Sequence, residues 1–290
     1  MATEYHINYH THNRYDAPVT EAFFEFLVAP CQDNTQKVSS LTFSNSLGQE
    51  LYTHGNPFNF NIHCLRSTKH FSDFKFSMKA TVEKSQPWFA VNSLPFAEEQ
   101  AILADRKFYI DHHLYLGFTR FTSILESYHS RLLNRPLKQP VFDYLTKLNQ
   151  YVYELLEFDP VPTNVHTTAS EVFHLGKGVC QDYTHLFLSI ARLNRIPCRY
   201  VSGYLNQGGN LVGSAVMHAW VEAFIPGYGW FGFDPTNNLL AGIDHIKAAH
   251  GVDYSDCSPI RGILKTQGQN HTSYYVDVLV NQMQESAQQQ

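Results

Sequence analysis

The stretch HLGKGVCQDYTHLFLSIARLNRIPCRYVSGYL, residues 174–205, places a glycine-flanked cysteine where a loop turns into a helix. The apolar spacing predicts a helix that begins near Cys180 and ends near Asn194, because Pro197 follows shortly afterwards. Residues 198–205 then alternate as a β-strand. We therefore expect Cys180 in the first turn of a helix that is followed directly by a strand.

A second strand, a tight turn and a third strand are predicted further along the chain. Residues 215–225, AVMHAWVEAFI, alternate apolar and polar side chains, and residues 230–235, WFGFDP, return after the turn PGYG. The segment NQGGN, residues 206–210, is typical of a hairpin turn. The helix at Cys180 is therefore followed by predicted strands that are joined by turns.

The register of this hairpin decides whether His218 and Asp234 share a face. A loop over residues 225–229 pairs Phe224 with Trp230 and leaves Asp234 diagonal to His218, about 7–8 Å away between backbones. A loop one residue shorter puts the two side chains on opposite faces, unless a bulge restores them. We predict the register that places both on one face.

The chain divides into a β-rich N-terminal part and a mixed part. Residues 1–90 alternate with period two between turn residues and predict an all-β domain, a small sandwich or curled sheet. Residues 91–282 are predicted to form a second domain, with its core at about 155–240, and the Gln-rich residues 283–290 to form a disordered tail. Amphipathic spacing predicts helices over residues 118–133 and 141–158.

Composition excludes several classes of protein. The 290 residues are 43% hydrophobic, which indicates a folded chain, and a net charge of −5 without a Lys/Arg cluster argues against nucleic-acid binding. The sequence has no run of about 18 apolar residues and so predicts no membrane span. The N-terminus lacks the basic and apolar regions of a secretory signal. An odd, scattered set of cysteines predicts free thiols in a reducing compartment, and hence the cytoplasm. The cysteines are Cys31, Cys64, Cys180, Cys198 and Cys257.

Cys180 has two interpretations. The thiolate is the reactive form of cysteine, and the dipole and free N–H groups of a helix N-terminus favour that anion. Gly176 and Gly178 permit a tight turn and leave room for a substrate, and nearby N–H groups could line an oxyanion hole. Free cysteines are also common as small core residues. Position alone leaves both interpretations open.

A nucleophilic cysteine needs a base, and three histidines are candidates. His185 lies about 140° around the helix from Cys180, which favours a packing role. His174 lies in the approaching loop and stays open as a candidate. His218 is favoured, because Asp234 on the adjacent strand can orient the imidazole and stabilise its charged form.

Two further acids lie near these residues. Glu222 shares the predicted face of His218 and is the reserve acid, although a solvated strand glutamate is the simpler interpretation. Asp182 falls in the first helical turn, where acidic side chains usually interact with the free N–H groups and the helix dipole. We therefore expect a structural role for Asp182.

The motifs GKGVCQDYTHLFLSIARLNRIPCRYVSGYL and MHAWVEAFIPGYGWFGFDPTNN resemble the core of the bacterial transglutaminase-like cysteine-protease superfamily. The resemblance implies an α+β fold, in which a nucleophile helix packs on an antiparallel sheet in a papain-like core, with an N-terminal all-β domain. It implies Cys180 as nucleophile, His218 as general base and Asp234 as orienting acid.

We expect Gly178, Val179, Gln181 and Trp220 to form the oxyanion hole or to support the site. The resemblance continues more weakly into IDHIKAAHGVDYSDCSPIRG, where relatives commonly read HI-x-x-A-x-GRDY-x-D. Val252 stands where arginine is expected, so a salt bridge from that arginine is absent.

The family implies acyl transfer through a thioester at a peptide or isopeptide amide bond. Water as acceptor gives a protease or amidase, and an amine gives a transglutaminase. Hydrolysis of a protein or peptide substrate is the favoured interpretation, with transglutaminase activity or a non-catalytic peptide-binding scaffold as alternatives. The sequence leaves the oligomeric state open.

No cofactor or metal site is expected from the sequence. His10 and His12 have the spacing of two ligands on one strand face, and His112 and His113 are adjacent. Neither pair comes with further ligands at a recognised spacing.

Overall fold

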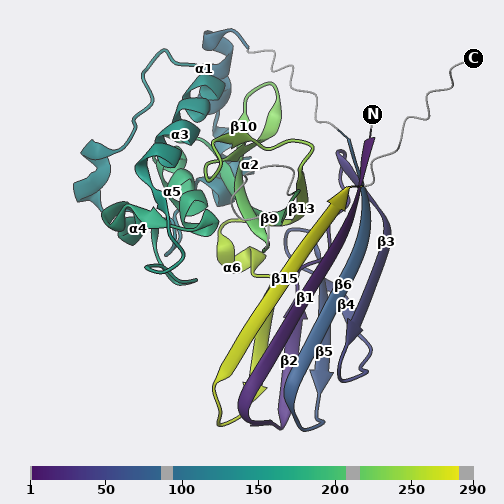
Figure 1. The fold of residues 1–290 in the computed structure, drawn as a ribbon. Helices are drawn as coiled ribbons and strands as arrows, with labels where there is room; N and C mark the ends of the chain where they lie inside the picture. The colour runs from purple at the N-terminus through teal and green to yellow at the C-terminus, as the bar shows by residue number, and fades with distance from the viewer. Residues whose placement is uncertain (1, 86–93, 207–215, 281–290) are drawn as a thin grey trace, which may run out of the picture.

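The computed structural model describes residues 2–85, 94–206 and 216–280. Figure 1 shows two parts of the molecule, a long β-sandwich and a compact part in which helices pack against a sheet. The fold is α+β with an N-terminal β region, as the sequence predicts. The predicted tail at 283–290 and most of the NQGGN turn lie outside the described residues.

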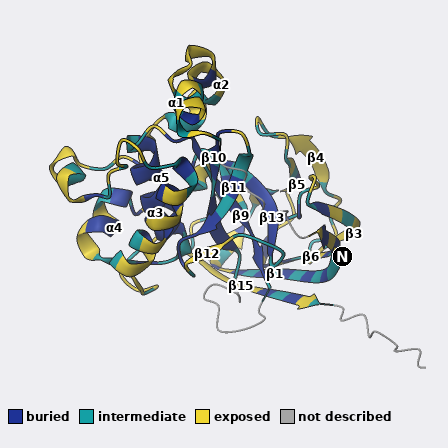
Figure 2. Cartoon of the chain, turned by 90° about the horizontal axis from the view of Figure 1, so that it is seen from above, coloured by how far each residue is buried: buried dark blue, intermediate teal, exposed yellow. Residues whose placement is uncertain are grey.

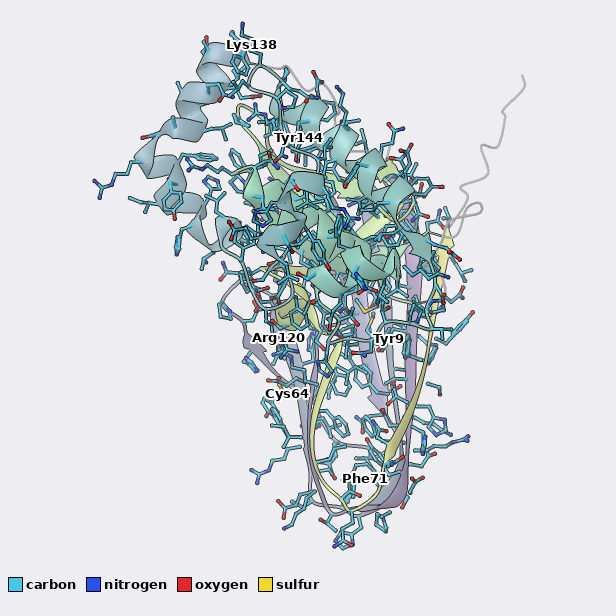
Figure 3. All side chains as sticks on the ribbon, turned by 90° about the vertical axis from the view of Figure 1, so that its left-hand side faces the viewer. Tyr9, Cys64, Phe71, Arg120, Lys138 and Tyr144 are labelled. Atoms are coloured by element: carbon cyan, nitrogen blue, oxygen red, sulfur yellow. The ribbon has the colours of Figure 1, made fainter. Side chains whose placement is uncertain are left out.

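Two four-stranded antiparallel sheets form the sandwich, in the orders β15-β1-β6-β3 and β14-β2-β5-β4. Alternating burial along β1 sends Tyr5, Ile7 and Tyr9 into the core between the sheets, where Phe24 and Phe74 stack at 4.5 Å. Tyr9 is labelled on this sheet in Figure 3. The strands are β1 Ala2–Val19, β2 Glu21–Phe26, β3 Gln36–Asn45, β4 Tyr52–Gly55, β5 Asn61–Ser67, β6 Phe71–Ser85, β14 Ile260–Lys265 and β15 Asn270–Val280.

The C-terminal strands correct the predicted domain boundary. The sequence predicts that residues 91–282 form a single domain separate from the N-terminal one, but β14 pairs with β2 and β15 pairs with β1. Val276 and Val278 of β15 are buried in the sandwich core. The sequence does not reveal this pairing, because alternation along a strand shows which side chains are buried but not against which sheet the strand packs.

The other part is a five-stranded antiparallel sheet, in the order β12-β11-β10-β9-β13, that is covered by helices. Helix α5 is buried along most of its length and contacts β9 and β10. The remaining strands are β7 Glu157–Phe158, β8 Lys177–Gly178, β9 Cys198–Leu205, β10 His218–Ile225, β11 Gly229–Asp234, β12 Leu239–Leu240 and β13 His245–Gly251. The helices are α1 Phe96–Ala104, α2 Arg106–Leu116, η1 Glu126–Arg131, α3 Val141–Leu155, α4 Ala169–Leu175, α5 Cys180–Leu193 and α6 Tyr254–Cys257.

The predicted helices are partly right. The helix at 141–158 is found as α3, and Tyr144 of this helix is fully buried (Figure 3). Residues 118–133 form turns and the short 3-10 helix η1 instead. The hydroxyl groups of Thr119 and Thr122 bond to backbone N–H groups of this segment, which favours turns over a helix.

Helices α1 and α2 are absent from the prediction. They lie at the periphery and carry much exposed surface in Figure 2. Tyr109, Ile110 and Leu114 of α2 are exposed, so the segment presents no clean apolar stripe to read from the sequence. None of the helices in the described ranges is long and apolar enough to cross a membrane.

The two parts share a packed boundary. Tyr204 of β9 and Ile246 of β13 belong to the sandwich core although their strands lie in the other sheet. The Tyr204 hydroxyl donates a hydrogen bond of 2.5 Å to the carbonyl of Val28. The sheet that carries the candidate site is therefore held against the sandwich by buried contacts.

Burial of β15 in the sandwich predicts the effect of a pair of substitutions. Val276→Ala removes two buried methyl groups and should lower the free energy of unfolding by about 2 kcal/mol. Leu279→Ala, on the same strand but 53% exposed, should change it by about 0.5 kcal/mol or less. Urea denaturation measures both. Equal effects of the two substitutions would contradict the assignment of β15 to the sandwich.

Candidate active site

The loop before α5 places Cys180 at the first position of the helix. Helix α4 ends at Gly176, whose φ of 66° is a left-handed conformation that glycine adopts without strain. The chain then pairs β8 in parallel with β7 and enters α5 at Val179. Cys180 itself is partly exposed.

Asp182 fixes this entry and takes the role that the sequence predicts for it. Its Oδ2 accepts hydrogen bonds of 2.8 Å from the Val179 N–H and from the Thr163 hydroxyl. A Cβ at Gly178 would lie 2.6 Å from the Asp182 side chain. The glycine therefore makes room for Asp182 rather than for a substrate. Burial raises the pKa of Asp182 to about 6, although both hydrogen bonds oppose the shift.

The predicted oxyanion residues are only partly suited to that role. The Val179 N–H is already bonded to Asp182, and the Gln181 side chain donates to the Val165 carbonyl at 3.3 Å. The backbone N–H groups of Cys180 and Gln181 remain, because the first turn of a helix has no acceptor for them within the helix. Those two groups are the oxyanion donors that the local geometry offers.

The hairpin of β10 and β11 has the predicted register. Phe224 pairs with Trp230, and the ladder continues to Val221 opposite Phe233. His218 and Asp234 therefore share a face, and His218 Nε2 lies 2.9 Å from Asp234 Oδ2 with both side chains fully buried.

Asp234 accepts hydrogen bonds from five donors. Oδ1 accepts from the backbone N–H groups of Thr236 and Asn237. Oδ2 accepts from the Asn237 amide and from the Nε2 atoms of His218 and His245, at 2.9, 2.9 and 3.1 Å. Burial alone would raise the pKa of Asp234, but the two histidines outweigh it and hold the pKa well below its usual range. The carboxylate stays ionised without solvent contact.

His218 is held between this carboxylate and the cysteine. Burial lowers the pKa of the imidazole, but the charge and hydrogen bond of Asp234 and the interaction with the Cys180 thiol raise it well above its usual value. Because Nε2 is bonded to Asp234, Nδ1 is the nitrogen left for the thiol; it is buried and has no conventional hydrogen-bond partner among the described residues. An imidazolium that faces a thiol through Nδ1 is the arrangement that stabilises a thiolate.

His245 is the site residue that the sequence interpretation missed. Its Nδ1 accepts from the Gly242 N–H at 3.3 Å, so Nε2 carries the proton that it donates to Asp234. Burial lowers the pKa of His245 despite the neighbouring carboxylate. His245 is therefore a neutral donor that holds Asp234, whereas His218 is the charged partner. The only signal was the HI pair in the weaker part of the family resemblance.

Trp220 packs beside the two histidines. Its ring lies at 27° to the His218 ring, with 6.3 Å between centroids, and edge-on to His245 at 5.3 Å. A Cβ at Gly203, which pairs with His218 from β9, would lie 2.2 Å from the Ile246 carbonyl oxygen and 2.6 Å from the indole ring. The tryptophan thus packs beside two histidine rings that are both buried.

The other candidates lie away from this cluster. His185 is fully buried on another face of α5, stacks on Phe121 and accepts from the Tyr254 N–H, and burial lowers its pKa to about 3. His174 is exposed in the last turn of α4. Glu222 is neither a reserve acid nor solvated, because it accepts from Arg199 at 2.6 Å and from Lys247 at 2.7 Å.

The described residues contain two groups whose ligand atoms lie close enough to hold a metal ion. His218, Asp234 and His245 form the first, but the hydrogen bonds between their ligand atoms already explain why these atoms are close. Glu25, His54 and Cys64 form the second group, on the sandwich. The first group is thus suited to proton chemistry: the positioned carboxylate and imidazole can activate a thiol for attack on a carbonyl carbon.

Comparison with known sequences finds a family model that matches the part of the chain with this geometry. Residues 131–235 match the model of the Transglutaminase-like superfamily. An uncharacterized protein of Mycobacterium leprae, ML0607, is 37% identical over 127 residues, which make up 42% of this chain and 45% of that protein. A protein-glutamine gamma-glutamyltransferase of Pseudomonas aeruginosa is 28% identical over 210 residues, 67% of this chain and 30% of that protein. The matched part thus spans less than half the length of either relative.

A solved structure shares the whole fold. The "Putative Cysteine Protease from Cytophaga hutchinsonii" superimposes with a TM-score of 0.75 at 20% identity, over 97% of this chain and 91% of that one. The superposition covers the sandwich as well as the helical part, so both belong to one shared architecture. Residues 131–235 of this chain are therefore similar to the transglutaminase-like superfamily, and the whole chain shares its fold with the solved structure.

Proposed function

We propose that the protein is a cysteine-dependent hydrolase that cleaves peptide or isopeptide amide bonds through Cys180, His218 and Asp234. The observation that carries the proposal is the buried hydrogen bond of 2.9 Å between His218 and Asp234, with the thiol of a helix-opening cysteine against the same imidazole. A protein or peptide is the proposed substrate. The five cysteines are all unpaired, which supports a reducing compartment, the cytoplasm.

The proposed reaction has two steps. In the first, Cys180 Sγ attacks the amide carbonyl carbon, His218 Nδ1 gives its proton to the leaving nitrogen, and the C–N bond breaks to leave a thioester. The N–H groups of Cys180 and Gln181 stabilise the negative oxygen. In the second, water attacks the thioester, His218 takes its proton, and the C–S bond breaks to release the acid and the thiolate.

Amine transfer is the second candidate, and the gamma-glutamyltransferase relative favours it. The same thioester then reacts with a primary amine in place of water, and the product is a new amide. The triad residues take identical roles in both reactions, so the acceptor has to be identified by its product.

Selective alkylation tests the activated thiol. Iodoacetamide at about pH 6 should modify Cys180 first, because the residue is partly exposed and its thiol interacts with the His218 imidazolium. His218→Ala should abolish this selectivity, and His174→Ala, which changes an exposed histidine near the same helix, should preserve it. Peptide mass spectrometry measures the sites. Labelling of Cys180 no faster than that of the partly exposed Cys31 would contradict the proposal and would favour a non-catalytic scaffold.

Product analysis separates hydrolysis from amine transfer. The protein is incubated with libraries of peptides and γ-glutamyl amides, with and without a primary amine, and the products are identified by mass spectrometry. We expect the free acid as the main product in both conditions, and none with Cys180→Ala. Amine-bearing product in excess of the acid would show that the protein is a transferase.

The pH dependence of kcat/KM tests the two partners of His218. Asp234→Asn removes the charge that raises the pKa of His218, so the alkaline limb should move to lower pH and the rate should fall about 10²–10⁴-fold. His245→Leu removes a neutral donor from Asp234, which leaves more negative charge on the carboxylate for His218, so the alkaline limb should move to higher pH. His245→Gln retains an N–H donor and should restore the original limb. A shift of the alkaline limb in the same direction for Asp234→Asn and for His245→Leu would contradict these assignments.

A further inference from the structure

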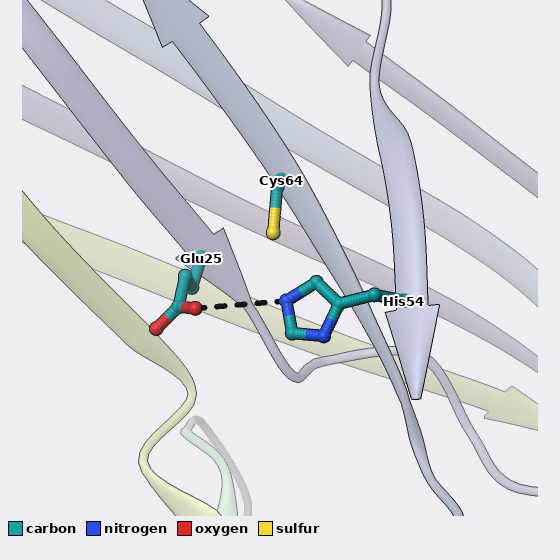
Figure 4. A group of neighbouring side chains, drawn as sticks. All are labelled: Glu25, His54 and Cys64. Carbon is teal, nitrogen blue, oxygen red and sulfur yellow. Dashed lines mark ion pairs between the residues drawn. The ribbon is translucent and has the colours of Figure 1, made fainter. Parts of the chain in front are cut away.

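The second group of possible ligands lies on the sandwich, on three neighbouring strands (Figure 4). Glu25 of β2 pairs with Cys64 of β5, and Cys64 pairs in turn with Tyr52 of β4. His54 is two residues from Tyr52 and so lies on the same face of the sheet. The register therefore brings the side chains of Glu25, His54 and Cys64 together, with every pair of ligand atoms within 4.8 Å.

Cys64 is enclosed although it belongs to the outward face of its sheet. Leu65, its neighbour, lies in the sandwich core, so strand alternation points Cys64 the other way. The cysteine nevertheless has 0% exposure, while the side chains of Glu25 and His54 keep 26% and 46% of theirs. The sulfur therefore forms the floor of a small polar group whose other two members reach solvent.

His54 presents a lone pair to this group. Its Nδ1 lies 3.3 Å from the carbonyl of Gly55 and donates to it, which leaves Nε2 without a proton in the neutral ring. Nε2 lies 3.7 Å from Glu25 Oε1, beyond the range of a hydrogen bond. Two ligand atoms bound to one tetrahedral zinc ion lie about 3.4 Å apart. The separation is therefore closer to that of two metal ligands than to that of a hydrogen-bonded pair.

We propose that Glu25, His54 and Cys64 form a zinc-binding site. Thiolate, imidazole and carboxylate are all zinc ligands, and the donation from His54 to a backbone carbonyl is the outer-shell contact that usually fixes the tautomer of a ligating histidine. Three protein ligands leave the fourth position to water. On binding, Cys64 loses its proton to solvent and the S–Zn bond forms, with no change of oxidation state.

The site would fasten the edge of the sandwich. Strand β4 lies at the end of its sheet and is exposed along its four residues. A zinc ion held by β2, β4 and β5 links this edge strand to two inner strands. Binding of zinc releases the proton of the Cys64 thiol, so zinc affinity should increase with pH.

Cobalt serves as the spectroscopic probe, because a thiolate bound to Co²⁺ gives a ligand-to-metal charge-transfer absorption band. The full-length Cys180→Ala protein, in which the other thiol near a possible metal group is absent, should bind one equivalent of Co²⁺ with this band. Zinc should displace the cobalt. Cys64→Ser should lose the band, and Cys31→Ser, a partly exposed thiol in the same half of the molecule, should keep it.

His54→Ala provides the second variant, because its exposed side chain can be removed without disturbing the core. It should weaken zinc binding, measured by competition with a chelator, by more than the roughly 10–100-fold that loss of an outer-shell partner costs. Absence of the band from the Cys180→Ala protein, a band that persists in Cys64→Ser, or a change below about tenfold in His54→Ala would overturn the proposal.

Discussion

The site depends on one buried carboxylate. Asp234 lies out of solvent and yet remains ionised, because five donors satisfy its two oxygens. A buried charge of this kind is stable only when it is paired and fully hydrogen-bonded. The pairing divides two histidines into different roles: His218 takes the positive charge, and His245 stays neutral because its Nδ1 is occupied by the Gly242 N–H. The protonation of His218 thus depends on the hydrogen bonds that the rest of the chain donates to the Asp234 carboxylate.

The rest of the fold brings a thiol to that proton. Asp182 binds the Val179 N–H and thereby sets the start of α5, so Cys180 begins the helix at a defined point. The hairpin of β10 and β11 sets the face of His218, and Trp220 covers the imidazole. The sandwich contributes at a distance, through the buried contacts of β9 and β13 with its core. The start of α5, the register of the β10–β11 hairpin and the packing of the sheet are separate constraints, and together they position the thiol beside the His218 imidazole.

Local patterns in the sequence were sufficient for the elements that carry the site. The start of α5, the end before Pro197 and the Phe224–Trp230 pairing follow from cap, proline and alternation rules, and the structure agrees with each. Long-range choices were beyond those rules. The sequence pattern of residues 260–280 does not show that these strands pair with the N-terminal sheets. The sequence around His245 likewise does not show that this side chain reaches Asp234. The space that Gly178 leaves for Asp182 could not be foreseen for a related reason, because Asp182 approaches the glycine only once the helix has formed.

The protonation states of the two histidines at Asp234 test the central claim most directly. Nitrogen chemical shifts of histidine-labelled protein, assigned with His218→Ala and His245→Gln, report the proton on each ring nitrogen between about pH 6 and 8. The account predicts an imidazolium at His218 throughout this range and a neutral His245 with its proton on Nε2. A neutral His218 at pH 7 that titrates near the ordinary histidine value of about 6.5 would contradict it.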